Sequence, residues 1–205
     1  MINWQSFPIR SVLASLIVIT LYGCASAPEQ SSPAINPVQA VAPNLEQLTT
    51  KQASQLAQAK TQLNNGQYEE AKKILLKIHR SASNVSVLSN LALVYYKSGD
   101  LESAAKFVGK AIQIAPGQAQ IHNLAGTINL DLRQFQKAEN AFKEALRLDG
   151  DYALAHYNLA ILYDIYYQDI DSAYTHYLKY LALINYEDKQ TLEWVDQLKY
   201  SITQE

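Results

Sequence analysis

Small and apolar residues recur at a fixed period from about residue 51 of this 205-residue chain. Four segments align on these small residues: Ala59, Ala92, Gly126 and Ala160 in the first half of each, and Ala71, Ala104, Ala138 and Ala173 in the second. Gly66 and Gly99 are 33 residues apart, and Ala104 and Ala138 are 34 apart. Each segment is therefore predicted to form two antiparallel helices, in which small residues permit close approach and large ones fill the space between them.

The turns inside and between these segments have their own residues. Gly66 and Gly99 are predicted to close the turn within the first two units, because glycine adopts a left-handed backbone at little cost. Pro116 is expected to stop a helix between units two and three. The fourth unit has about one extra residue between Tyr163 and Ala173 and no glycine there, so its turn is expected to be distorted.

The period and the small-residue positions resemble the tetratricopeptide repeat family, most strongly in units two and three. The resemblance covers residues 51–184 and implies an all-α fold, a right-handed superhelical solenoid of about four helix-turn-helix repeats. Residues 185–205 add Trp194, Val195, Leu198 and Ile202 at helical spacing. A single helix is predicted there, which caps the last apolar face of the solenoid.

The start of the chain has a different pattern. Residues 11–22 are almost wholly apolar, a length that suits the core of a signal peptide and is short of the roughly 20 residues of a spanning helix. Leu21, Gly23 and Cys24 resemble the lipobox of bacterial lipoproteins, and Cys24 is the only cysteine. The resemblance implies removal of residues 1–23 and a covalent lipid, with acyl chains such as palmitate, on Cys24. The alternative is an uncleaved anchor with an incidental cysteine.

Residues 24–50 follow the proposed cleavage site and hold four of the six prolines of the chain, at positions 28, 33, 37 and 43. Such a stretch buries too little apolar surface to fold and is predicted to be a disordered tether that reaches roughly 70 Å when extended. Ala25, and not Asp, follows Cys24, which favours the outer membrane. The protein is thus expected to be lipid-anchored at the periplasmic face of the outer membrane.

Composition and motifs exclude several classes of function. The net charge of −2 and the lack of a basic patch argue against nucleic acid. His122 and His156 hold the same position in successive units, where either helix packing or a metal or catalytic role is open. No thiolate or carboxylate stands at ligand spacing beside them, and no phosphate loop or nucleophile motif occurs. We expect no enzyme activity, no metal and no cofactor beyond the lipid.

The family resemblance also implies a binding surface, because the first helices of tetratricopeptide arrays line a concave groove. Carried over residue by residue, the peptide-binding or protein-binding groove comprises Lys60, Asn90, Tyr96, Lys97, Asn123, Thr127, Tyr157, Asn158 and Asp164. Amides and tyrosines suit a peptide backbone; a merely solvated polar face is the alternative. The basic clamp with which some family members hold a terminal carboxylate is absent, since its places in unit two hold Ser86, Ser89 and Asn90.

Tyrosines are concentrated toward the end of the chain, with ten of the fourteen after residue 150. Two interpretations stay open at this point: an aromatic docking patch, or core and inter-helix packing.

Taken together, the sequence predicts an outer-membrane lipoprotein that acts as a scaffold or assembly factor for an envelope complex, similar to the pilotins of type IV pili and secretion pores. The alternatives are an adaptor for an inner-membrane energy-transducing system or for a peptidoglycan enzyme. The expected partner is an envelope protein or peptide segment, whose identity the sequence leaves open together with the oligomeric state.

Overall fold

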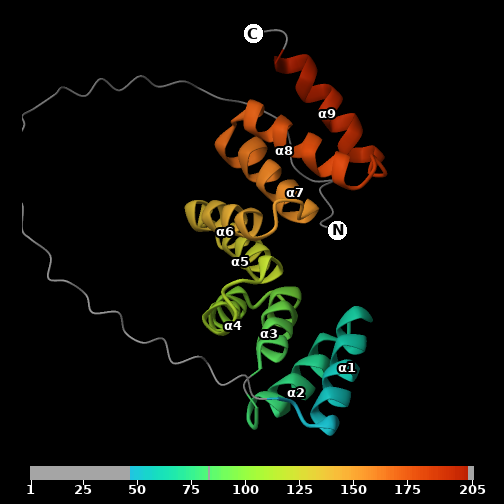
Figure 1. The fold of residues 1–205 in the computed structure, drawn as a ribbon, viewed down its shortest axis with the longest axis vertical. Coiled ribbons are helices and arrows are strands. Elements are labelled where there is room, and N and C mark those ends of the chain that lie inside the picture. The colour runs from blue at the N-terminus through green and yellow to red at the C-terminus, as the bar shows by residue number, and fades with distance from the viewer. Residues whose placement is uncertain (1–46, 83, 203–205) are drawn as a thin grey trace, which may run out of the picture. The chain divides into compact units, whose positions relative to one another are not determined.

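The computed structural model describes residues 47–82 and 84–202, and every regular element in those ranges is a helix (Figure 1). The elements are α1 (Thr50–Asn64), α2 (Tyr68–His79), α3 (Val85–Lys97), α4 (Leu101–Ile114), α5 (Ala119–Asp131), α6 (Phe135–Leu148), α7 (Ala153–Ile161), the π-helix η1 (Leu162–Tyr167), α8 (Ile170–Leu183) and α9 (Lys189–Ile202). The predicted all-α fold is confirmed.

The predicted lipid-anchored segment lies outside the described residues, and with it Cys24 and most of the tether. Within the described part, no helix has both the length and the apolar character needed to cross a bilayer.

Helices pack in pairs along the chain. We call α1, α3, α5 and α7 the first helices and α2, α4, α6 and α8 the second helices. Each first helix packs on the second helix that follows it, and each second helix packs on the next element, so that α8 is followed by α9. Successive first helices also touch one another. This arrangement is a solenoid of four helix pairs and a terminal helix, as the repeat pattern predicts.

The small residues lie where the two helices of a pair meet. Ala59, Ala92 and Ala160 of the first helices are wholly buried, as are the second-helix alanines Ala71, Ala104, Ala138 and Ala173. In the third pair, Gly126 is needed for close approach, because a Cβ atom there would overlap the ring of Phe142, which has no exposed surface. The spacing of small residues in the sequence therefore has a direct steric cause.

Each turn within a pair has one residue in the left-handed region. Gly66 and Gly99 have φ of +76° and +85°, which confirms the role predicted for them. Arg133 and Gln168 take the same conformation, with φ of 60° and 56°, although neither is glycine. The left-handed residues are thus 33, 34 and 35 residues apart along the chain.

The extra residue of the fourth unit is absorbed where α7 widens into the π-helix η1, just before the left-handed Gln168. The turn changes with it, as expected: the N–H of Asp169 donates to the carbonyl of Tyr163 six residues earlier, whereas the matching bonds of the other units span five residues. A π-helix closes hydrogen bonds over one residue more than an α-helix, so it absorbs an insertion at the end of α7. This device also positions Asp164, which lies within η1.

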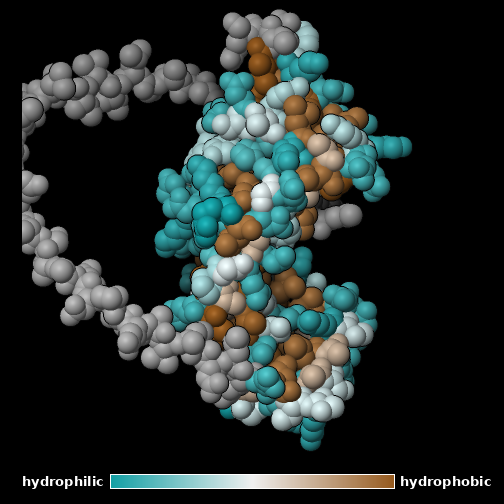
Figure 2. All heavy atoms as spheres, in the orientation of Figure 1, coloured by the Kyte–Doolittle hydropathy of each residue, from teal (hydrophilic) through white to brown (hydrophobic). Residues whose placement is uncertain are grey.

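Helix α9 covers the apolar side of α8. It buries Val195 and Leu198, and the ring of Trp194 lies 5.9 Å from the fully buried ring of Tyr177. Its first turn is fixed by Asp188, which accepts hydrogen bonds from the backbone N–H and the hydroxyl of Thr191 at 3.1 and 2.8 Å. Leu192 on α9 stays exposed. Figure 2 shows that hydrophobic and hydrophilic residues are mixed on the surface of this face.

Candidate functional site

Three of the predicted groove residues form a hydrogen-bonded group between α5 and α7. The Asn158 side-chain amide of α7 donates to Oδ1 of Asn123 at 2.9 Å and lies 3.5 Å from the hydroxyl of Thr127. Thr127 in turn donates to the backbone carbonyl of Asn123 at 3.1 Å. These side chains are therefore held in fixed positions by groups of the protein itself.

A second link joins α3 to α5. The Tyr96 hydroxyl of α3 lies near the carboxylate of Asp131, the last residue of α5. Burial and the negative charge of Asp131 both raise the pKa of Tyr96, so this hydroxyl stays protonated. Lys97 is exposed, and its ammonium lies 5.7 Å from the centre of the Tyr96 ring.

Lys60 and Asn90 are not joined to this group by any contact that the structure shows. Asn90 is half-buried and donates to the carbonyl of Ser86 on its own helix at 2.7 Å. Lys60 is exposed on α1, at the register position that Thr127 occupies in the third unit, since each directly follows the small residue of its helix. Both residues thus extend the row of polar positions toward α1, but as separate side chains.

The C-terminal end of the row is aromatic. The Tyr157 ring of α7 lies 4.8 Å from that of Tyr180 and 6.0 Å from that of Tyr177, both on α8. Asp164 is half-buried beside them, and the Tyr177 hydroxyl approaches its carboxylate at 3.5 Å. Burial raises the pKa of Asp164, because a desolvated carboxylate is less stable when charged.

Most of the C-terminal tyrosines pack inside the fold. Tyr177 has no exposed surface, and the Tyr166 ring lies 4.5 Å from the ring of Phe135. The Tyr163 hydroxyl donates to Glu139 at 3.0 Å, and Glu139 also pairs with Lys143 at 2.6 Å. Of the three tyrosines in η1, Tyr167 is exposed, with 38% of its surface accessible, whereas Tyr163 and Tyr166 are half-buried. The structure thus favours the packing interpretation for this part of the chain.

His122 and His156, which hold the same position in successive units, donate hydrogen bonds to backbone carbonyls. Nε2 of His122 donates to the carbonyl of Pro116 at 2.7 Å, and Nε2 of His156 donates to the carbonyl of Gly150 at 3.1 Å. Each histidine thus fastens its helix to the loop six residues earlier. Nδ1 of His156 lies 2.9 Å from Nδ1 of His176, so His176 donates to His156 across the α7–α8 pair.

Both rings of this pair are neutral at ordinary pH. Burial lowers the pKa of His156 and lowers that of His176 to about 4, with the nearby His156 as the second cause. The ring nitrogens of His156 are engaged in structural hydrogen bonds, and no group of three potential metal ligands occurs in the described part of the chain. The arrangement is that of helix-packing histidines.

Several of these contacts lie beyond what spacing along the chain indicates. The Asn123–Asn158 bond and the His156–His176 pair join residues 35 and 20 positions apart. The sequence indicated in part that Asn123 and Asn158 stand at groove positions of successive units and that His176 is on the helix that pairs with that of His156. Neither observation specifies a hydrogen bond, because side-chain reach depends on how the two helices cross.

Comparison with known proteins agrees with this architecture. Residues 84–151 match the family model described as tetratricopeptide repeat. A human relative, superkiller complex protein 3, is 30% identical over 125 residues, which is 59% of this chain but only 8% of that protein. The matched family is a repeat of helix pairs and not a catalytic family.

Two solved structures of other proteins have the same fold. Pseudomonas aeruginosa PilF superposes with a TM-score of 0.68 at 19% identity, over 75% of this chain and 69% of that one. The first tetratricopeptide domain of Spaghetti, solved with a bound HSP90 peptide, gives a TM-score of 0.54 at 18% identity, over 58% of this chain and 93% of that one. At these identities the likeness establishes the fold.

Proposed function

We propose that this protein is a non-catalytic scaffold that holds a polypeptide partner on its polar row, by which we mean the predicted groove residues of the first helices and η1, from Lys60 on α1 to Asp164 on η1. The observation that carries the proposal is the hydrogen-bonded group in which the buried Asn123 fixes the half-buried side chains of Thr127 and Asn158 on neighbouring first helices. Amides both donate and accept, as a peptide backbone requires. Because these side chains are already ordered, a partner that binds them loses less conformational entropy than it would on a mobile surface.

The comparisons support a peptide or protein ligand. A solved domain of the same fold carries an HSP90 peptide, and the family match covers α3 to α6. Two of the side chains at the places of the basic clamp, Ser89 and Asn90, instead donate to the backbone carbonyls of Val85 and Ser86 on their own helix. A partner bound along its length through its backbone therefore fits this row better than a terminal carboxylate.

The proposal includes a location. We infer that Cys24 carries a lipid, that residues 24–50 are a tether and that the helical part acts at the periplasmic face of the outer membrane. Confinement near a membrane raises the effective concentration of the scaffold for other envelope components. The likeness in fold to PilF supports an assembly factor of the pilotin kind for an envelope complex.

Site-specific photocrosslinking in cells tests the scaffold. A photoreactive residue in place of Lys97, which is exposed beside Tyr96 on α3, should capture a discrete envelope protein. The matched control replaces Lys106, which is equally exposed but lies on the second helix α4. Identical adducts from both positions, or none from Lys97, would contradict binding at the row. The captured protein also separates a pilus or secretion component from a peptidoglycan enzyme or an inner-membrane motor.

Replacement of the cysteine tests the location independently. Cys24→Ser should abolish labelling of the protein by a palmitate analogue and release it from the membrane fraction, because the acyl chains supply the membrane affinity. Ser26→Ala, two residues further on, is the matched control and should keep the label. A Cys24→Ser protein that stays with the membrane would instead favour an uncleaved anchor.

A further inference from the structure

Charged side chains are rare on the first helices and are sorted by sign. The first helices and η1 together carry five: Lys51 and Lys60 on α1, Lys97 on α3, Asp131 on α5 and Asp164 on η1. All the basic residues lie on the first two of these helices and both acids on the last two. The second helices, in contrast, carry both signs on every helix.

Ion pairs in the described part of the chain use the second helices, and none uses a charge of the first helices. In residues 47–82 and 84–202 the ion pairs are Glu69–Lys72, Glu70–Lys73, Glu139–Lys143, Glu144–Arg147 and Asp151–Lys179, and each uses a second helix. None includes Lys60, Lys97 or either acid of the first helices. The contacts shown for Asp131 and Asp164 are the neutral hydroxyls of Tyr96 and Tyr177.

The position of the two acids is unfavourable for the fold alone. Asp131 is the last residue of α5, and Asp164 lies in η1, which continues α7. The C-terminal end of a helix carries a partial negative charge, which repels acids and attracts bases. Asp164 is also partly removed from water, and this burial raises its pKa. The helix dipole therefore explains why a basic residue, Lys97, stands at the end of α3, but it does not explain why Asp131 and Asp164 stand near the ends of their helices.

The charges are spread over neighbouring helices in chain order. Successive first helices touch, and with about 10 Å between packed helix axes the outermost charges, Lys60 on α1 and Asp164 beyond α7, are roughly 30 Å apart. That distance exceeds the screening length of about 8 Å at physiological salt, so these outer charges act on a ligand independently, whereas Lys97 and Asp131 lie on adjacent helices. An extended segment of about nine residues spans the row, at about 3.3 Å per residue.

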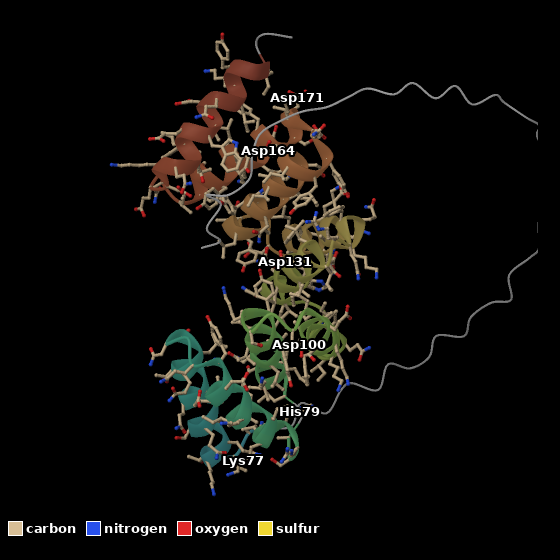
Figure 3. The ribbon with its side chains drawn as sticks, turned by 180° about the vertical axis from the view of Figure 1, so that it is seen from behind. Lys77, His79, Asp100, Asp131, Asp164 and Asp171 are labelled. Atoms are coloured by element: carbon tan, nitrogen blue, oxygen red, sulfur yellow. The ribbon has the colours of Figure 1, made fainter. Side chains whose placement is uncertain are left out.

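We propose that the row binds a polypeptide segment with divided charge, its acidic end against Lys60 and Lys97 and its basic end against Asp131 and Asp164. Figure 3 labels the two acids on α5 and η1. The inference rests on the proposed function and names the partner chemistry of the same surface. The cationic end of the segment supplies the counter-charge that the fold does not give Asp131 and Asp164, and it sets the direction in which the segment lies.

Two synthetic peptides of identical composition test the inference on the full-length protein. In one peptide the glutamates occupy one half and the lysines the other; in its isomer they alternate. Fluorescence anisotropy at low salt should show the divided peptide binding at least about tenfold more tightly, a difference of about 1.4 kcal/mol, and the advantage should shrink as salt is added. A photoreactive group on its acidic half should label α1 or α3.

Charge-neutral variants locate the binding. Lys97→Met and Asp164→Asn should each weaken the divided peptide severalfold and leave the isomer unchanged. Lys77→Met on α2 and Asp171→Asn on α8 are the matched controls, exposed charges of the second helices, and should keep full affinity (Figure 3). Because Lys97 is exposed, Lys97→Met should not change the stability of the fold, and it therefore still tests the inference if Asp164→Asn lowers stability.

The outcomes separate the two proposals. Equal affinity for the two isomers, no measurable binding of either, or equal losses in the control variants would overturn the divided-charge segment. If crosslinking from Lys97 in cells still captures a partner, the scaffold stands without it. Failure of that crosslinking would overturn the scaffold itself.

Discussion

The contact between Gly126 and Phe142 gives the sharpest test of the packing. A methyl group at Gly126 would overlap three atoms of the Phe142 ring, which is fully buried and cannot move aside into solvent. The other three units carry alanine at this position; in unit one the alanine is Ala59, and Leu75 holds the register position that Phe142 has in unit three. We therefore expect the effect of Gly126→Ala to depend on the residue at 142.

The magnitude follows from two opposing terms. Overpacking a filled core costs about 1–3 kcal/mol, whereas glycine to alanine inside a helix stabilises by about 1 kcal/mol. Gly126→Ala should therefore destabilise the protein by about 1 kcal/mol. In a Phe142→Leu background, which recreates the pair of unit one, the overlap is relieved and the same change should stabilise by about 0.5–1 kcal/mol. The coupling free energy between the two sites is then about 2 kcal/mol.

Urea unfolding followed by circular dichroism on the four proteins of this cycle measures the coupling. The matched control is Gly109→Ala in the middle of α4, where an added Cβ meets no atom within 4 Å. That change should stabilise by about 1 kcal/mol through helix propensity alone. If Gly126→Ala stabilised the natural protein as much as Gly109→Ala does, or had the same effect in both backgrounds, the steric explanation of this glycine would be wrong.

Three further changes test other parts of the fold. Arg133→Gly should raise the urea midpoint, by about 1 kcal/mol of stability, because Arg133 has a φ of 60° that costs a side chain this much; a lower midpoint would contradict this. Burial lowers the pKa of His176 to about 4 from an ordinary value of 6.5, so the unfolded chain binds protons that the folded chain does not. Stability is thus fully present above pH 6.5 and falls toward pH 4, and His176→Gln should flatten that fall in a pH series of urea midpoints. Trp194→Ala should cost about 3 kcal/mol and speed proteolysis within α9, because it uncovers the face around Tyr177; unchanged digestion would argue against a capping role.

The sequence by itself determined the elements and their order. Residues one helix turn apart reveal which face of a helix is buried, and the 33-to-34-residue recurrence of small residues reveals where two helices must cross. Gly66 and Gly99 marked two of the four turns, since glycine is the residue that enters the left-handed region most cheaply. These features are local in the chain, which is why reading the chain alone was sufficient for them.

Tertiary structure decided how the insertion in unit four is absorbed and which side chains meet. A one-residue excess can be taken up by a turn or by a helix, and in this structure it widens the end of α7 into η1 and adds one residue to the span of the hydrogen bond that closes the turn at Gln168. The Asn123–Asn158 and His156–His176 contacts depend on distances between residues that are far apart in sequence. Those distances are set by the crossing of packed helices, a property of the assembled solenoid that no single repeat contains.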